Sequence, residues 1–311
     1  MTTGLTKRFG DRVVVDRLDL SIPTGSVCGF VGPNGAGKTT TIRMLLGLIR
    51  PTAGMGMVLG GDLAEPSTYL DRVGALIESP AFYPQLSGYD NLLTLTRLGR
   101  IPASVIAPVL DRVGLADRGG ERYQRYSLGM KQRLGIAAAL LASPSLLILD
   151  EPTNGLDPAG IVEMRVLVRS LAEDGMTVFV SSHLLSEIEH ICDHLVMINR
   201  GKSVFQGSVD DLRAFRTSEL VIRPDAAEFL GDLAQLAVAR GLHVEIDATS
   251  SAVIVSDGVR FAGELNRAAL DAGITVVHLA ERERSLEEAY FAITGTHSGD
   301  VRGQAALGEV G

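Results

Sequence analysis

The segment from Gly32 to Thr40 has the residue types and spacing of a phosphate-binding loop. It reads Gly-Pro-Asn-Gly-Ala-Gly-Lys-Thr-Thr and fits the pattern G-x-x-x-x-G-K-[ST]. Glycines let the backbone close around a phosphate, and backbone N–H groups at a helix start attract an anion. The residues expected to contact phosphates are Gly32, Asn34, Gly35, Ala36, Gly37, Lys38, Thr39 and Thr40.

The sequence on either side of this loop supports the same interpretation. The segment 27–31 is short and apolar, which is typical of a buried strand, and the segment 39–48 carries apolar residues at helical spacing. A glycine-rich turn with a surface lysine is the alternative, but it does not explain the order strand, loop, helix. We therefore expect a nucleoside triphosphate here, with Lys38 reaching its β and γ phosphates and the Thr39 hydroxyl available to Mg²⁺.

Two carboxylates follow a second apolar strand. The segment 146–149 ends in Asp150-Glu151-Pro152, and the carboxyl ends of parallel strands are where ligands collect. We expect Asp150 to hold Mg²⁺ beside Thr39, because this ion prefers oxygen ligands, and Glu151 to take a proton from an attacking water. An isolated Asp-Glu-Pro would instead be a polar strand exit; the phosphate loop favours the catalytic interpretation.

Two further residues each admit two interpretations. His183 follows the apolar segment 177–180, and a lone histidine at a strand end is usually structural or solvated. Beside a phosphate loop, however, it is placed to contact a γ-phosphate. Phe9 lies just ahead of a strand, where an aromatic ring either packs in the core or stacks on a base.

Composition and charge restrict the class of protein. The 311 residues are 46% hydrophobic with 5% aromatics and no Trp, which is typical of a folded protein with an aliphatic core. The net charge of -8 and pI near 5.3 argue against a general nucleic-acid binder. Cys28 and Cys192 show no metal spacing and resemble core thiols of a reducing compartment, and no apolar run reaches the length of a membrane span. We expect a cytoplasmic chain that reaches a membrane only through a partner.

Changes of pattern along the chain predict two domains. The fold class expected for 1–215 is α/β, because an antiparallel β region precedes the phosphate loop and a helical block over 89–141 follows it. Residues 216–296 have the order strand, helix, strand, strand, helix, strand, which predicts a small α+β ferredoxin-like domain with accessory or regulatory function. An amphipathic helix is expected over 285–293, and the Gly-rich tail 297–311 is expected to be disordered.

Taken together, motifs over about residues 4–215 resemble the ATP-binding subunit of an ABC transporter. The motifs are the phosphate loop, Tyr126–Met130 followed by Lys131-Gln132-Arg133, Leu149–Pro152, Gly155–Pro158 and His183. The resemblance implies a P-loop ATPase core with an antiparallel β subdomain and a helical subdomain. It also implies that Phe9 stacks on adenine, and that the cofactors are ATP and Mg²⁺.

The resemblance assigns catalytic and dimer roles to particular residues. Glu151 polarises the attacking water, and His183 contacts the γ-phosphate, while Lys38 stabilises phosphate charge. Two such domains dimerise head to tail, so Ser127 and Gly129 of one complete the ATP site of the other, and Asp157 communicates across the dimer.

The sequence departs from the family pattern at three places. The signature Leu-Ser-Gly-Gly-Gln is replaced by Tyr-Ser-Leu-Gly-Met at 126–130, and the loop that usually offers a Gln to Mg²⁺ and the permease offers Glu78. Glu78 remains a candidate metal ligand, and with Phe82 and Tyr83 a candidate permease contact; loop packing is the alternative for the two aromatics. Only Met-Thr-Thr precedes Gly4, so we expect a shortened edge strand or a start downstream of the true one.

The segment 76–84, together with the altered signature, is similar to ATPases of drug, antibiotic and lantibiotic-peptide export. We therefore expect an ATPase that powers export through a separate membrane permease, with a second ATP-binding subunit, a homodimer, as partner. The alternative is a soluble ABC-type ATPase acting on DNA or ribosomes, or an ATP-dependent clamp or sensor. DNA-maintenance members insert long modules between the loop and the signature, whereas here Lys38 and Ser127 are 89 positions apart (127 − 38).

Overall fold

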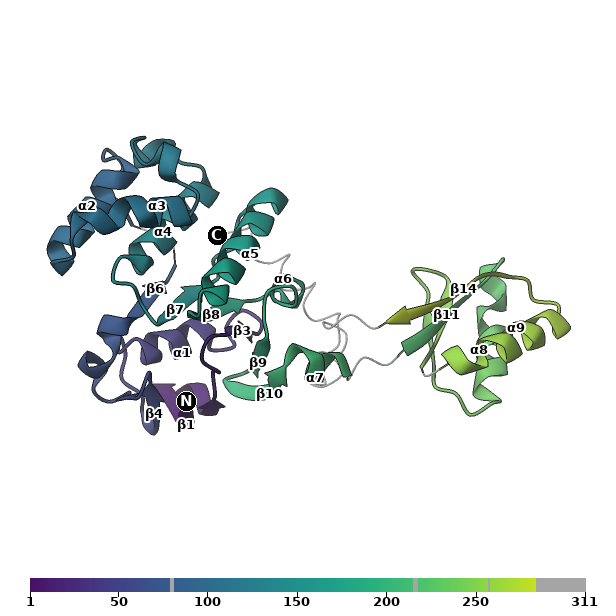
Figure 1. Cartoon of the computed structure of the whole chain (residues 1–311). Coiled ribbons are helices and arrows are strands. Elements are labelled where there is room, and N and C mark those ends of the chain that lie inside the picture. The colour runs from purple at the N-terminus through teal and green to yellow at the C-terminus, as the bar shows by residue number, and fades with distance from the viewer. Residues whose placement is uncertain (79–80, 215–217, 257, 284–311) are drawn as a thin grey trace. The chain divides into compact units, whose positions relative to one another are not determined.

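The chain divides into two compact units, Met1–Val209 and Asp210–Gly311 (Figure 1). The computed structural model describes residues 1–78, 81–214, 218–256 and 258–283. The division falls six residues (215 − 209) before the boundary that we expected, and the functional domain assignments stay predictions. The expected helix over 285–293 and the tail 297–311 lie outside the described residues.

The first sheet of unit 1 is antiparallel and holds the N-terminal segment. Its strands are β1 (Thr2–Phe9), β2 (Arg12–Leu20), β4 (Ala53–Val58) and β5 (Gly61–Asp62), in the order β2-β1-β4-β5. The expectation of a shortened edge strand at the start of the chain is wrong, because β1 lies between β2 and β4 and hydrogen-bonds to both. The backbone of Met1 is itself paired, donating to the carbonyl of Met57 at 2.8 Å.

The second sheet of unit 1 is mostly parallel, and the predicted motifs follow the carboxyl ends of its strands. Its strands are β3 (Val27–Val31), β6 (Val73–Leu76), β7 (Leu146–Asp150), β8 (Thr177–Ser182), β9 (His194–Asn199) and β10 (Lys202–Ser208). The order is β10-β9-β3-β8-β7-β6; β9 and β10 are antiparallel, and the other described neighbours are parallel. All residues of β3, β7 and β8 are buried, as expected of parallel strands covered on both faces.

The helices of unit 1 include the predicted helical block. They are α1 (Lys38–Leu45), α2 (Gly88–Gly99), α3 (Ile106–Arg112), α4 (Leu128–Leu140), α5 (Pro158–Glu173) and α6 (Leu185–Ile188); α7 (Val209–Ala214) spans the boundary. Figure 1 shows α2, α3 and α4 gathered as a group. Short 3-10 helices lie at Pro66–Thr68, Leu70–Arg72, Ala103–Val105, Ala116–Arg118, Tyr123–Arg125, Ala227–Phe229 and Val259–Phe261.

Two of these helices are shorter than we expected. The helix after the phosphate loop ends at Leu45 instead of Leu48, because Gly47 adopts a left-handed φ of 66° that ends the helix. The apolar spacing over 184–192 predicts an amphipathic helix as well. The structure has only α6 there, because the chain then joins the sheet, where the Asp193 N–H donates to the Val27 carbonyl.

The core of unit 1 joins the two sheets through aliphatic and aromatic side chains. The rings of Phe30 on β3 and Phe179 on β8 stack with centroids 5.2 Å apart, and both are fully buried. Ile42 and Met44 of α1 lie in the same core cluster. The predicted P-loop ATPase architecture, an α/β core with an antiparallel sheet and a helical block, is therefore confirmed.

In the described part of unit 2, a small antiparallel sheet packs against helices α8 and α9. Its elements are β11 (Ser218–Pro224), α8 (Leu230–Val238), β12 (Val244–Asp247), β13 (Ala252–Ser256), α9 (Ala262–Asp271) and β14 (Val276–Glu283). The sheet order is β12-β13-β11-β14 with antiparallel neighbours, and Leu233 of α8 and Leu265 of α9 are fully buried in its core. The element order is the predicted one, and the ferredoxin-like assignment stays a prediction. Among the described residues, no helix could cross a membrane.

Candidate nucleotide site and adjoining surface

The phosphate loop connects β3 to α1, and close backbone contacts explain its glycines. Gly35 and Gly37 have positive φ angles of 78° and 110°, which favour glycine. A Cβ at Gly32 would lie 2.3 Å from the carbonyl oxygen of Ile198, and one at Gly37 would lie 2.8 Å from that of Val14. The loop can therefore follow this course only without side chains at these positions.

The first turn of α1 provides backbone donors at the mouth of the loop. Helix geometry leaves the N–H groups of the first turn without an acceptor inside the helix. Here these belong to Lys38, Thr39 and Thr40, since the Thr41 N–H is already bonded to the Gly37 carbonyl at 2.9 Å. Donors and helix dipole together favour an anion at this end of α1.

Lys38 is buried at the loop and already has acidic and carbonyl partners. Its side chain is 5% exposed, and its Nζ lies 2.7 Å from the Gly32 carbonyl oxygen and 3.4 Å from that of Pro33. The Glu151 Oε1 atom lies 3.1 Å from the same Nζ. A phosphate oxygen that approached Lys38 would have to replace this carboxylate.

A buried serine connects the Asp150 carboxylate to the backbone of Glu151 at the end of β7. Asp150 pairs in register with Ser181 of β8, and the Ser181 hydroxyl donates to Asp150 Oδ1 at 2.5 Å. The same hydroxyl oxygen accepts the Glu151 N–H at 3.0 Å. Ser181 is fully buried and Asp150 nearly so, and this network therefore fixes the backbone from which both carboxylates project.

The Glu151 carboxylate lies between a cation and an imidazole. Its Oε2 atom is 2.6 Å from Nδ1 of His183, while Oε1 faces Lys38. Glu151 has a φ of 50°, which is uncommon for a residue with a side chain and typical of functional sites. The structure thus brings together all three residues that we predicted to be catalytic.

The remaining predicted nucleotide contacts line the loop or stand apart from it. Asn34 and Gly35 are exposed at the loop, whereas Ala36 is buried. Phe9 ends β1 in the antiparallel sheet, is 51% exposed, and has Lys7 Nζ 5.0 Å from its ring centroid. An exposed ring is available for stacking, and the core alternative for Phe9 is therefore wrong.

Glu78, which we considered as a metal ligand, has a different partner. Its carboxylate pairs with the guanidinium of Arg43 on α1, and its side chain is 65% exposed. Glu78 follows β6 with a φ of 60°, another left-handed angle for a non-glycine residue. Among the described residues, no group of three or more His, Cys, Asp or Glu is arranged to hold a metal ion.

The residues predicted to act across a dimer lie at helix starts. Ser127 caps α4 by accepting the Met130 N–H at 3.3 Å, and Asp157 caps α5 by accepting the Gly160 N–H at 2.8 Å. A Cβ at Gly129 would meet Leu156 Cδ2 at 3.8 Å. The altered signature therefore lies beside the segment that carries Asp157.

A buried amide fixes the loop that carries Tyr83. Asn91 is 2% exposed; its Oδ1 accepts the Tyr83 N–H at 2.8 Å, and its Nδ2 donates to the Tyr83 carbonyl at 3.1 Å. Phe82 packs edge-on against Tyr123 with centroids 5.3 Å apart, and burial raises the pKa of the Tyr123 hydroxyl. The Tyr83 side chain itself is 65% exposed. An ordered backbone therefore presents this ring to solvent.

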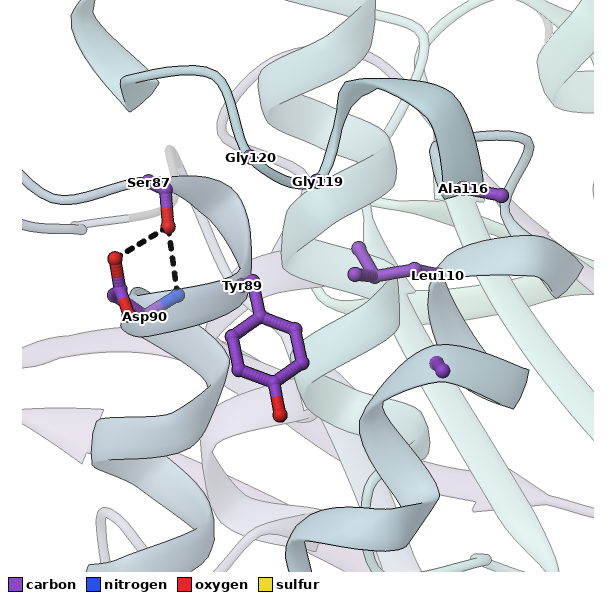
Figure 2. Close-up of a pocket in the computed structure, with 8 residues that line it drawn as sticks. Ser87, Tyr89, Asp90, Leu110, Ala116, Gly119 and Gly120 are labelled. Carbon is purple, nitrogen blue, oxygen red and sulfur yellow. Dashed lines mark hydrogen bonds between the residues drawn. The ribbon is translucent and has the colours of Figure 1, made fainter.

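A pocket of 520 Å³ adjoins this loop within the helical block. Its lining consists of Ser87, Tyr89, Asp90, Ala107, Leu110, Ala116, Gly119 and Gly120. Figure 2 shows the Tyr89 ring opposite Leu110, and the Ser87 hydroxyl bonded to Asp90, whose carboxylate oxygen it approaches to 2.6 Å. We call this pocket together with Tyr83 the Tyr83 surface.

Sequence reasoning did not find several of these residues. Ser181 belongs to a fully buried strand, and such a pattern gives no sign that its hydroxyl bonds both the Asp150 carboxylate and the Glu151 N–H. Asn91 and Arg43 lie within helical patterns, and only their long-range partners distinguish them. The pocket consists largely of small residues, which carry no signal of their own.

Comparison with known proteins is consistent with this geometry. A family model described as ABC transporter matches residues 15–154. The chain is 41% identical over 301 residues to the bacitracin transport ATP-binding protein of Bacillus licheniformis, covering 94% of this chain and 96% of that protein. It is 36% identical to the daunorubicin resistance ATP-binding protein of Streptomyces coeruleorubidus, with 94% of each chain covered.

Solved structures agree with the sequence comparisons. The structure of an ATP binding subunit of an ABC transporter aligns with a TM-score of 0.61 at 29% identity. The alignment covers 68% of this chain and 91% of that one.

Proposed function

This chain belongs to the ABC transporter family as an ATP-binding, ATP-hydrolysing subunit, and from that premise we propose that it powers export of an antibiotic-like molecule through a separate membrane permease. The observation that carries the proposal is the position of the Glu151 carboxylate between Lys38 and His183 at the edge where parallel strands end. That arrangement suits hydrolysis better than nucleotide binding alone.

The residues at this edge fit ATP together with Mg²⁺. The loop donors and Lys38 would hold the phosphates, and Phe9 would stack on the adenine. Thr39 and the buried Asp150 offer the oxygen ligands that Mg²⁺ prefers, whereas Glu78 is paired with Arg43 and is not part of this donor set. When bound, Mg²⁺ would neutralise phosphate charge, while protein residues would orient the water and accept its proton.

We propose that Glu151 is the general base and His183 its neighbour at the γ-phosphate. When a phosphate oxygen of ATP binds Lys38 in place of Glu151 Oε1, that carboxylate oxygen becomes free to accept a proton from the attacking water. His183 Nδ1, 2.6 Å from Oε2, keeps the carboxylate oriented during that exchange. Lys38 and the backbone donors then stabilise charge that develops on the transferred phosphoryl group.

A second ATP-binding subunit is expected to complete the site. Ser127 is exposed at the start of α4, and it would approach the γ-phosphate held by the other copy. Asp157, which caps α5, would report across the dimer whether that phosphate is present. Unit 2 is proposed to act as an accessory or regulatory domain.

The Tyr83 surface is the proposed docking site for the permease. Its pocket is lined mostly by small residues together with Tyr89, Asp90 and Leu110, and we propose that it accepts a side chain of a cytoplasmic permease helix. Asp90 at its rim would favour a basic residue beside that side chain. The rigid loop around Tyr83 is suited to transmitting movement, because Asn91 ties its backbone to α2.

The transported molecule is proposed by class. Two relatives with near-complete coverage are named for bacitracin transport and for daunorubicin resistance. On that likeness we propose an antibiotic or peptide as substrate and self-resistance as the role.

The first experiment is ATP turnover of the wild type and of Glu151→Gln with Mg²⁺, with oligomeric state recorded by light scattering. We expect turnover to fall by about 10²- to 10⁴-fold in the variant, with a dimer retained on ATP. Unchanged turnover in the variant would remove Glu151 from its proposed role.

Export requires a second measurement on membranes. We expect a permease encoded alongside this chain to co-purify with it and to stimulate its turnover. An active ATPase that associates with no permease would instead favour the clamp or sensor alternative.

A further inference from the structure

Glu78 introduces a negative charge where a neutral amide is usual in the family that the chain resembles. It follows β6, and β6 pairs with β7 so that Leu76 lies opposite Leu149. Glu78 therefore stands at the same sheet edge as Asp150 and Glu151. A third carboxylate here, if it had no cationic partner, would oppose the binding of an anionic nucleotide.

The helix that provides the phosphate donors also provides the compensating cation. Arg43 lies five residues after Lys38, about 7.5 Å further along the axis of α1, and in its last turn. α1 contacts β7 as well as β2, and the Arg43–Glu78 pair joins its last turn to the chain just after β6. There the Arg43 guanidinium bonds Glu78 Oε1.

This ion pair is not a strong source of fold stability. Arg43 is 42% exposed and Glu78 is 65% exposed, and solvent-exposed pairs contribute little to unfolding free energy. Yet Glu78 keeps an uncommon left-handed φ of 60° at this point. The direct consequence of the pair is electrostatic, because the Arg43 guanidinium lies against the Glu78 carboxylate and offsets its charge.

We propose that Arg43 is a positioning residue that holds the Glu78 carboxylate at the C-terminal turn of α1, away from the phosphates, and offsets its charge. The inference rests on the proposed nucleotide site at the other end of α1. It explains how a carboxylate occupies this position without weakening ATP binding. Arg43 acts through Glu78 and touches no phosphate.

The test is a double-mutant cycle on nucleotide affinity in the full chain. A ribose-labelled fluorescent ATP analogue is titrated at low salt with EDTA, so that neither metal nor permease enters the measurement. The variants are Arg43→Met, Glu78→Gln and the double substitution. Arg112→Met is the matched control, because Arg112 pairs with Asp174 at similar exposure, 38% and 63%.

We expect Arg43→Met to weaken binding of the analogue by about 5- to 10-fold, and the added Glu78→Gln to restore it to within about twofold. The loss of affinity in Arg43→Met should be smaller for AMP than for ATP, because AMP carries less charge. It should also be smaller at high salt, which screens the interaction. Arg112→Met should leave affinity unchanged. Thermal unfolding of each variant shows whether it is still folded, so that a loss of affinity in a folded variant can be assigned to the charge.

Three results would overturn the inference. Unchanged affinity in Arg43→Met would reduce the pair to a surface contact. Equal losses in the single and the double variant would mean that Arg43 acts on the nucleotide directly. A uniform loss for ATP and AMP would point to a structural effect. If the wild type itself did not bind the analogue, the proposed nucleotide site would fail first.

Discussion

Two regions of the same unit are encoded by the sequence in different ways: the Tyr83 surface and the nucleotide edge, which is our name for the phosphate loop together with Asp150, Glu151 and His183. At the nucleotide edge, functional residues follow strand ends within a few positions, and glycines are required by contacts as close as 2.3 Å. At the Tyr83 surface, an ordered loop depends on Asn91 and Tyr123, which come from separate segments. The difference shows that a site fixed by backbone geometry leaves a motif, whereas a surface fixed by side-chain contacts does not.

The largest expected effect is at Gly32. Gly32→Ala would place a methyl group against the Ile198 carbonyl and displace the loop, and we expect ATP affinity to fall by more than about 100-fold. Isothermal titration with ATP measures this. Gly231→Ala is the control, because a Cβ there meets nothing within 4 Å. Wild-type affinity in Gly32→Ala would contradict the claim that backbone contacts encode this edge.

Ser181→Ala tests the same region through a residue that bonds Asp150 and Glu151 but is not itself proposed to contact the nucleotide. Loss of its hydroxyl leaves Asp150 and the Glu151 N–H without a buried partner, which costs about 1–3 kcal/mol. We also expect kcat to fall by about 10-fold or more, because Glu151 is no longer held. Steady-state turnover and chemical denaturation are the two measurements. A stability loss with unchanged kcat would make Ser181 merely structural.

Asn91→Ala is the matching substitution at the Tyr83 surface. It removes a buried amide that bonds the backbone of Tyr83, and we expect the free energy of unfolding to fall by about 1–3 kcal/mol. ATP affinity should remain within about twofold, because Asn91 bonds the backbone of Tyr83, Leu86 and Ser87 and not the phosphate loop. Denaturation and titration compare the two effects directly. An affinity loss like that of Gly32→Ala would mean that the two regions are not separable.

Tyr83→Ala should have the smallest effect on the isolated chain. The ring is 65% exposed, so its removal should change unfolding free energy by less than about 0.5 kcal/mol. Its expected consequence is weaker association with permease-containing membranes, measured by co-sedimentation. Tyr89→Ala in the pocket should act in the same direction. Full association of both variants would place the docking site elsewhere.

The sequence predicted most of the nucleotide edge because chemistry there follows strand and helix ends. Lys38, Asp150, Glu151 and His183 were all found from local pattern, and the structure brings Lys38, Glu151 and His183 into contact. Ser181 could not be found, since its role depends on the register of two strands that lie 31 residues apart.

Helix lengths and paired charges were harder to predict. The helix expected after His183 was too long, because apolar periodicity does not reveal that Asp193 leaves to bond the β3 backbone. Likewise, nothing in the local sequence links Arg43 to Glu78, which are 35 residues apart. Such contacts arise from tertiary packing, which periodicity does not encode.

The burial of the two cysteines has a practical consequence. Cys28 and Cys192 are the chain's only cysteines, and both are buried; burial raises the pKa of the Cys28 thiol to about 12, and that of Cys192 well above its ordinary value. Buried thiols in apolar surroundings react poorly with labelling reagents. A cysteine introduced at the exposed Gln85 would therefore take up a spectroscopic label selectively. The native sequence is thus already suited to following the Tyr83 loop in real time as ATP binds.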